Sequence, residues 1–168
     1  IIEGERALCF WLSQQTEVSL NHPNEQIKRE ASDYVSLMTP VVKSLFTDLA
    51  MEITSDAMQI HGGYGFTKDQ GIEQLYRDNR ITPIYEGTNS VQAADLVFRK
   101  LSNKNGNIIE KFLEMIKAEC ETKNEKVKNF TKQLNYYLDI LHKFTGWIDD
   151  KNKIEKDDDS AAANDYLK

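Results

Sequence analysis

The 168-residue sequence has few cysteines and histidines, and its charged residues give no positive excess. Its two cysteines, Cys9 and Cys120, lie far apart, and we expect a reduced, intracellular and therefore cytoplasmic setting rather than a disulfide framework. The three histidines (His22, His61 and His142) show none of the close spacing of metal ligands. We therefore expect no metal site.

Long apolar runs are also missing, since no segment approaches the roughly 20 apolar residues that a membrane span needs. The formal net charge of -6 argues against nucleic-acid binding. The chain begins with Ile1 and shows no basic N-terminal region or cleavage site, so we expect no signal peptide. We interpret the missing initiator Met as a hint that the chain is part of a longer protein.

Helical periodicity fills most of the chain, without strand-like alternation or an internal repeat. It predicts helices over about 5–20 and 25–38, and the longest periodic run extends from Val42 to His61. Thr39-Pro40 is interpreted as the N-cap and first residue of this third helix, with a kink in one long helix as the alternative. The sequence therefore predicts an all-α antiparallel helical bundle.

Turn and capping residues set the remaining predicted boundaries. The glycines of 62–65 end the long helix, because glycine supplies left-handed backbone at a helix C-terminus. Asp69 is predicted to cap a short helix that ends at Asn79, and Thr88 or Ser90 to cap the next one. Further along we expect a turn over 103–107, amphipathic helix over 109–148 with a polar break near 117–126, a charged linker over 149–160, and the start of another helix over 161–168.

The segment Ile84-Tyr85-Glu86-Gly87-Thr88 contains the candidate catalytic group. Glu86 follows Pro83 in a segment too irregular for a surface helix and too apolar for an ordinary solvated loop. Loss of solvation raises the pKa of a carboxylate towards working pH, which suits a general base. The alternative is an exposed acid beside a helix N-terminus, where the helix dipole favours it. Gly87 either relieves strain or lets a substrate approach the backbone.

A second motif, Gln59-Ile60-His61-Gly62-Gly63-Tyr64-Gly65-Phe66, lies about 25 residues upstream of the first. Glycines there could simply end a helix. With the intervening Glu73–Asp78, however, the two motifs in this order resemble the C-terminal helical domain of acyl-CoA dehydrogenases. The match extends over about 37–101, and residues 39–43 and 95–101 are similar to a subgroup with an additional C-terminal helical region, which includes 3-methylmercaptopropionyl-CoA dehydrogenases.

The resemblance implies roles for individual residues. Glu86 would be the base that removes the α-proton of an acyl-CoA thioester, and its backbone N–H would help to hold the thioester carbonyl oxygen. The remaining implied positions are FAD contacts at Gln59, Gly62, Gly63, Thr88 and Ser90, and substrate contacts at Tyr85, Gly87 and Arg99. Ser90 departs from the glutamine or glutamate common in the family, and Arg99 lies about one residue out of register. Tyr85 could equally be a packed core residue. We expect His61 to be a packed or hydrogen-bonded histidine at the helix end. Arg77 and Asp78 are expected to brace their short helix against the bundle.

At the level of the whole protein, the resemblance implies FAD-dependent dehydrogenation of an acyl-CoA to a trans-2-enoyl-CoA, with electron-transfer flavoprotein as acceptor. It also implies a homo-oligomer, dimer or tetramer, that shares FAD sites. We expect residues 1–102 to be the family's C-terminal bundle domain and 103–168 the start of the extension. The isolated chain is expected to be inactive, because the family's N-terminal and middle domains are absent. An acyl-CoA oxidase and a catalytically silent FAD-binding relative are the alternatives.

Overall fold

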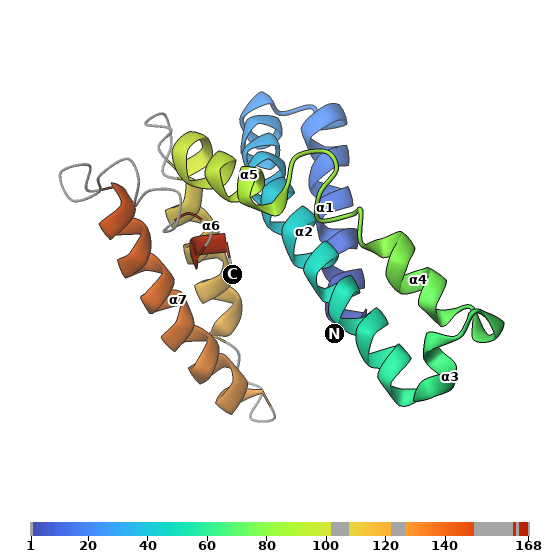
Figure 1. Ribbon diagram of the computed structural model, residues 1–168. Helices are drawn as coiled ribbons and strands as arrows, with labels where there is room; N and C mark the ends of the chain where they lie inside the picture. The colour runs from blue at the N-terminus through green and yellow to red at the C-terminus, as the bar shows by residue number, and fades with distance from the viewer. Residues whose placement is uncertain (1, 102–107, 122–126, 150–162, 164, 168) are drawn as a thin grey trace.

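The computed structural model describes residues 2–101, 108–121, 127–149, 163 and 165–167. Within these residues the fold is all helical, which confirms the predicted class. The elements, in chain order, are α1 (Ile2–Asn21), α2 (Glu25–Ile60), α3 (Gly63–Phe66), a short 3-10 helix η1 (Lys68–Gln70), α4 (Ile72–Asn79), α5 (Asn89–Ala94), a π-helical continuation η2 (Asp95–Leu101), α6 (Ile108–Cys120) and α7 (Lys128–Asp149) (Figure 1).

Helix α2 is the central element, and α1, α4, α5, η2 and α6 all pack against it. It begins at an Asn24 cap, whose side chain accepts hydrogen bonds from the backbone of Gln26 and Ile27. The helix continues unbroken through Pro40, so the predicted new helix at Thr39-Pro40 is wrong and the single long helix is correct. Pro40 is fully buried, and its packing offsets the loss of one backbone hydrogen bond. The Thr39 hydroxyl donates to the carbonyl of Val35 at 2.6 Å.

The far end of α2 stops where the glycine motif predicts. His61 is still right-handed, but Gly62 has a φ of +57°, which ends the helix. Gly65 then passes so close to α2 that an added Cβ would meet the carbonyl of Met58. The predicted Asp69 cap of the next helix is wrong, because Gly71 at φ +71° separates η1 from α4 and has no side chain to cap it.

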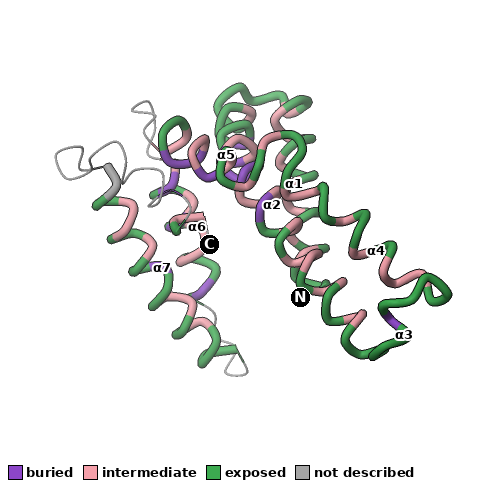
Figure 2. The backbone as a smooth tube through the Cα atoms, in the orientation of Figure 1, coloured by how far each residue is buried: buried purple, intermediate pink, exposed green. Residues whose placement is uncertain are grey.

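The main core lies where α2, η2, α6 and α7 meet, and the buried segments of Figure 2 converge there. Its buried members are Leu37, Leu96, Ile109, Leu113 and Leu138. Next to it, Trp11, Tyr34 and Phe112 bring together three rings from α1, α2 and α6, with centroids about 6 Å apart. These contacts hold the N-terminal helices and the α6–α7 pair in one bundle.

The C-terminal expectations are met in part. The predicted amphipathic helix is divided into α6 and α7, as the polar break indicated. The turn over 103–107 lies outside the described residues, as does the predicted linker over 149–160 apart from Asp149, which ends α7. Residues 163 and 165–167 are helical, Ala163 is buried, and the Tyr166 hydroxyl lies 2.7 Å from the Thr145 hydroxyl oxygen of α7.

Candidate active site

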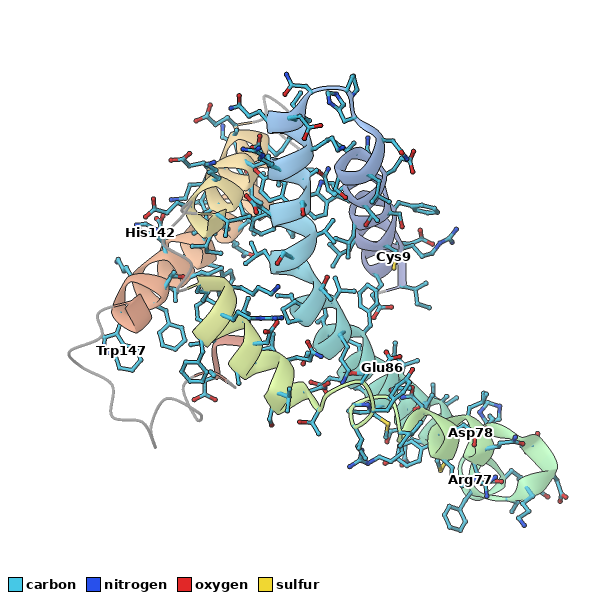
Figure 3. The ribbon with its side chains drawn as sticks, turned by 90° about the horizontal axis from the view of Figure 1, so that it is seen from above. Cys9, Arg77, Asp78, Glu86, His142 and Trp147 are labelled. Carbon is cyan, nitrogen blue, oxygen red and sulfur yellow. The ribbon has the colours of Figure 1, made fainter. Side chains whose placement is uncertain are left out.

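The candidate site is the loop between α4 and α5, which carries Glu86. Two consecutive amides, those of Ile84 and Tyr85, donate to the carbonyl of Ile81 at 2.9 and 3.0 Å. The amide of Asn89 then donates back across the loop to the carbonyl of Pro83 at 3.1 Å. These bonds close the loop on itself and present the residues between them at its outer bend. Figure 3 shows Glu86 beside α2, away from Arg77 and Asp78.

The backbone of Glu86 is left-handed, with a φ of +55°, and it is the one non-glycine residue of the described chain with positive φ. An L-residue pays about 1–2 kcal/mol for this conformation. Gly87 follows at φ +84°, so two consecutive residues are left-handed. Backbone strain of this kind persists where the surroundings over-determine it, and it clusters at functional sites.

Gln92 holds this left-handed pair from the next helix. Its Nε2 donates to the carbonyl oxygen of Glu86 at 3.0 Å. A Cβ on Gly87 would meet the same Nε2 at 3.1 Å and Val91 Cγ1 at 3.4 Å. The φ of Gly87 favours glycine, and this supports the strain-relief interpretation; the nearest neighbour of an added Cβ is the flexible end of Gln92.

Thr88 is the N-cap of α5, as one of the two predicted alternatives had it. Its φ and ψ are extended, and its Oγ1 accepts a hydrogen bond from the amide of Val91 at 3.2 Å. Its carbonyl accepts from the amide of Gln92 at 2.9 Å. Ser90 is exposed on the first turn of α5. Glu86 therefore lies just before a helix N-terminus, where the dipole favours a negative charge.

Asn89 joins the loop to α2 and is the residue that sequence reasoning missed. Its Oδ1 accepts from Lys43 Nζ at 2.7 Å, while its Nδ2 donates to Asp48 Oδ1 at 2.8 Å and to the Thr47 hydroxyl at 3.1 Å. The three partners lie within about one and a half turns of α2. No sequence signal pairs positions 41 to 46 residues apart, so this anchor is visible only in the structure.

The carboxylate of Glu86 is exposed in this chain, which contradicts the burial that its apolar neighbours predicted. The neighbours themselves are exposed too: Ile81, Ile84, Tyr85 and Val91 retain 54, 46, 49 and 56% of their accessible area. Tyr85 is thus not a core residue here. The loop instead presents one carboxylate among apolar side chains that the described residues leave about half exposed.

The predicted residues at the glycine motif lie elsewhere, at the end of α2. Gln59, Gly62 and Gly63 are all exposed, and a Cβ built on either glycine meets nothing within 4 Å. Between Asp48, which contacts the Glu86 loop, and Gln59, α2 rises by about 17 Å. The two predicted groups are therefore separate surfaces of this chain.

Other predicted residues stay outside both surfaces. Arg99 lies on η2 and pairs through its Nε with Asp95, one turn earlier. Arg77 is exposed and forms its ion pair, at 3.9 Å, with Glu73 of the same helix, so it does not brace α4 against the bundle by this pair. His61 is hydrogen-bonded at the helix end, as expected, through Nδ1 and the carbonyl of Ala57 at 2.9 Å.

Among the described residues, no three His, Cys, Asp or Glu side chains lie close enough to hold a metal ion. None of the described helices is long and apolar enough to cross a membrane.

A concave apolar region of about 320 Å³ lies between α1 and α2 and is lined by Cys9, Phe10, Phe46 and Ile53, among others. It is separate from the Glu86 loop.

Comparison with known proteins connects this geometry to a family. Residues 19–101 match the model of the acyl-CoA dehydrogenase C-terminal domain. Over 118 residues the chain is 41% identical to a 3-methylmercaptopropionyl-CoA dehydrogenase of Ruegeria pomeroyi, covering 70% of this chain and 20% of that protein. A butyryl-CoA dehydrogenase of Syntrophomonas wolfei is 32% identical over 116 residues, covering 69% and 19%.

A solved structure shares the fold at lower identity. Caenorhabditis elegans ACDH-11, determined in complex with C11-CoA, superposes with a TM-score of 0.72 at 22% identity, covering 98% of this chain and 33% of that one. The chain spans about a fifth of the length of the two curated relatives. The matched region includes both the glycine motif and the Glu86 loop.

Proposed function

The chain belongs to the acyl-CoA dehydrogenase family through its C-terminal domain at residues 19–101, and from this membership we propose that its parent protein oxidises an acyl-CoA thioester to a trans-2-enoyl-CoA. The observation that carries the proposal is the strained, left-handed Glu86, held in place by Gln92 on a loop anchored to α2. Backbone strain at an exposed carboxylate has no value for stability, which favours a role in chemistry.

Glu86 is the proposed base. Its carboxylate takes the proton from the α-carbon of the thioester and becomes a carboxylic acid, while negative charge develops on the thioester oxygen. The N–H of Glu86 forms no hydrogen bond with another described residue. It is therefore available to donate to that oxygen as the charge develops. Tyr85 and Gly87 flank the base and are the proposed substrate contacts, with Arg99 further along.

The chain's own residues are compatible with FAD, which is the cofactor that the family implies. A Cβ built on Gly62 or Gly63 meets nothing within 4 Å, so a cofactor group can approach the backbone closely there. Gln59, Gly62 and Gly63 would hold one FAD at this end of α2, and Thr88 and Ser90 would contact a second FAD near the Glu86 loop. FAD, when bound, supplies the acceptor for the hydride lost from the β-carbon.

The separation of the two surfaces favours an oligomer. Gln59, beside the Gly62-Gly63 surface, lies about 17 Å along α2 from Asp48 at the anchor of the Glu86 loop, and we propose that the two surfaces of one chain contribute to two FAD sites. We therefore propose a homo-oligomer, dimer or tetramer, with electron-transfer flavoprotein as the acceptor of electrons. Residues 1–102 would form the bundle domain and 103–168 the start of a C-terminal extension. By itself the chain is proposed to be inactive.

The test is anaerobic titration of the full-length protein with acyl-CoAs of different chain length, followed by flavin absorbance. We expect bleaching with at least one thioester. Glu86→Gln keeps the shape of the side chain but removes the base, and we expect it to slow flavin reduction by at least about 100-fold with FAD still bound.

Glu52→Gln is the matched control, because Glu52 is exposed on α2 and lies outside the loop; we expect it to reduce flavin at the wild-type rate. Wild-type reduction by Glu86→Gln would exclude Glu86 as the base. A flavin that no thioester bleaches would indicate a catalytically silent relative. Hydrogen peroxide release in air, with normal bleaching, would indicate an oxidase.

A further inference from the structure

We propose that Asn89 is a positioning residue that sets the geometry of Glu86 through the α2–α5 contact. The inference rests on the proposed function, in which Glu86 is the base. Asn89 is only three residues from Glu86, and its backbone and side chain are both engaged: its N–H donates to Pro83 within the loop, and its amide group binds α2.

The connection from Asn89 to Glu86 is short and continuous. Asn89 is the first residue of α5, so fixing its side chain on α2 fixes the first turn of that helix. Gln92 lies on the same turn and donates to the carbonyl of Glu86. The left-handed pair Glu86-Gly87 is thus held between two bonds, one at Pro83 and one at Gln92, that both depend on where α5 begins.

The charges on α2 dictate which way the Asn89 amide faces. Its oxygen faces the ammonium group of Lys43, and its nitrogen faces the carboxylate of Asp48. An aspartate at 89 would keep the bond to Lys43 but would place a second carboxylate against Asp48. An asparagine at 48 would then restore a donor and remove the repulsion. The pair can therefore be exchanged between α2 and α5 without loss of shape.

The experiment compares Asn89→Asp with the exchanged double variant Asn89→Asp/Asp48→Asn in the full-length protein. Stopped-flow measurement gives the rate of flavin reduction, and titration with a non-oxidisable acyl-CoA thioether gives binding. We expect the single variant to reduce flavin about 10- to 100-fold more slowly, since displacement of a reacting group by about 1 Å costs this much. Thioether binding is expected to change by less than about threefold, because Asn89 does not itself touch the substrate.

The exchanged double variant is expected to recover a rate within about threefold of the wild type. A residue that only stabilised the fold would instead lower FAD content and binding together with the rate. Should Asn89→Asp fail to retain FAD, Asn89→Ala removes every side-chain bond from this position to α2, including the one from Lys43, without adding a charge, and it is also expected to reduce flavin about 10- to 100-fold more slowly.

Two results overturn the positioning role: wild-type reduction by Asn89→Asp, or a double variant as slow as the single one. Neither bears on the proposed function, which fails separately if Glu86→Gln reduces flavin normally. If Glu86→Gln is inactive and Asn89→Asp has the wild-type rate, Glu86 is the base and Asn89 does not position it.

Discussion

The strain at Glu86 predicts an unusual order of stabilities for two small replacements. At most exposed positions alanine is more stable than glycine, because glycine loses more conformational freedom on folding. At φ +55° the order reverses, because alanine retains the left-handed cost that glycine avoids. We therefore expect Glu86→Gly to be more stable than Glu86→Ala.

The magnitude follows from two opposing contributions. A non-glycine residue pays about 1–2 kcal/mol in the left-handed region. Glycine forfeits about 0.4–1 kcal/mol through the greater freedom of the unfolded chain. The expected difference is about 1 kcal/mol in favour of glycine. The bond from Gln92 is made to the Glu86 carbonyl, so it survives in both variants and cancels from the comparison.

The assay is urea unfolding of the chain, followed by helical circular dichroism. Gln14 provides the control, since it is exposed in the middle of α1. There we expect Gln14→Gly to be about 1 kcal/mol less stable than Gln14→Ala. The difference in free energy of unfolding between the glycine and alanine variants should therefore have opposite signs at the two sites. The two differences should lie about 2 kcal/mol apart. If Glu86→Ala proved as stable as Glu86→Gly, the left-handed conformation of Glu86 would not exist in solution and the argument from strain would fail.

Two further changes test the fold around the site. Gly65→Ala would drive a Cβ into the carbonyl of Met58 and is expected to lower the free energy of unfolding by about 1–3 kcal/mol in the same urea titration. Gly63→Ala is the control: its Cβ meets nothing within 4 Å, and we expect the change to be neutral or slightly stabilising. Burial raises the pKa of Tyr34 to about 12 from an ordinary 10.0, so the folded state favours the neutral phenol. The unfolded chain ionises this residue first, and the free energy of unfolding therefore falls as pH rises from about 10 to about 12. Tyr34→Phe is therefore expected to lower sensitivity to alkaline unfolding above pH 10, and an unchanged alkaline transition would contradict the assignment.

Local chemistry explains which elements the sequence predicts well. The end of α2 at Gly62 and the Thr88 cap of α5 are both decided by residues within four positions of the boundary. The errors occur where tertiary packing or a competing neighbour prevails. Pro40 continues a helix because its ring is fully buried in the bundle, and Asp69 fails to cap α4 because Gly71 turns the chain between them.

The candidate site is predictable only in its residue types. A Tyr-Glu-Gly-Thr segment after a proline indicates a carboxylate in a loop, and the family resemblance supplies its role. The left-handed φ of Glu86 has no local signal, because glutamate is not a residue that favours it. The hydrogen bonds that join Asn89 to Lys43 and Asp48 cannot be predicted from the sequence either, because asparagine at the start of a helix is ordinarily explained by capping.

The structure separates what this chain supplies to the site from what it lacks. The backbone geometry of Glu86 is complete within the chain, because Gln92 and Asn89 fix it from neighbouring helices. The chain does not exclude water from Glu86, because the carboxylate and the surrounding apolar side chains are all exposed. A carboxylate becomes an effective base for a carbon acid when water is excluded from it. We infer that other parts of the parent protein, together with the proposed thioester substrate, would cover Tyr85 and Ile84 and so desolvate the proposed base, whose backbone position Gln92 and Asn89 already set.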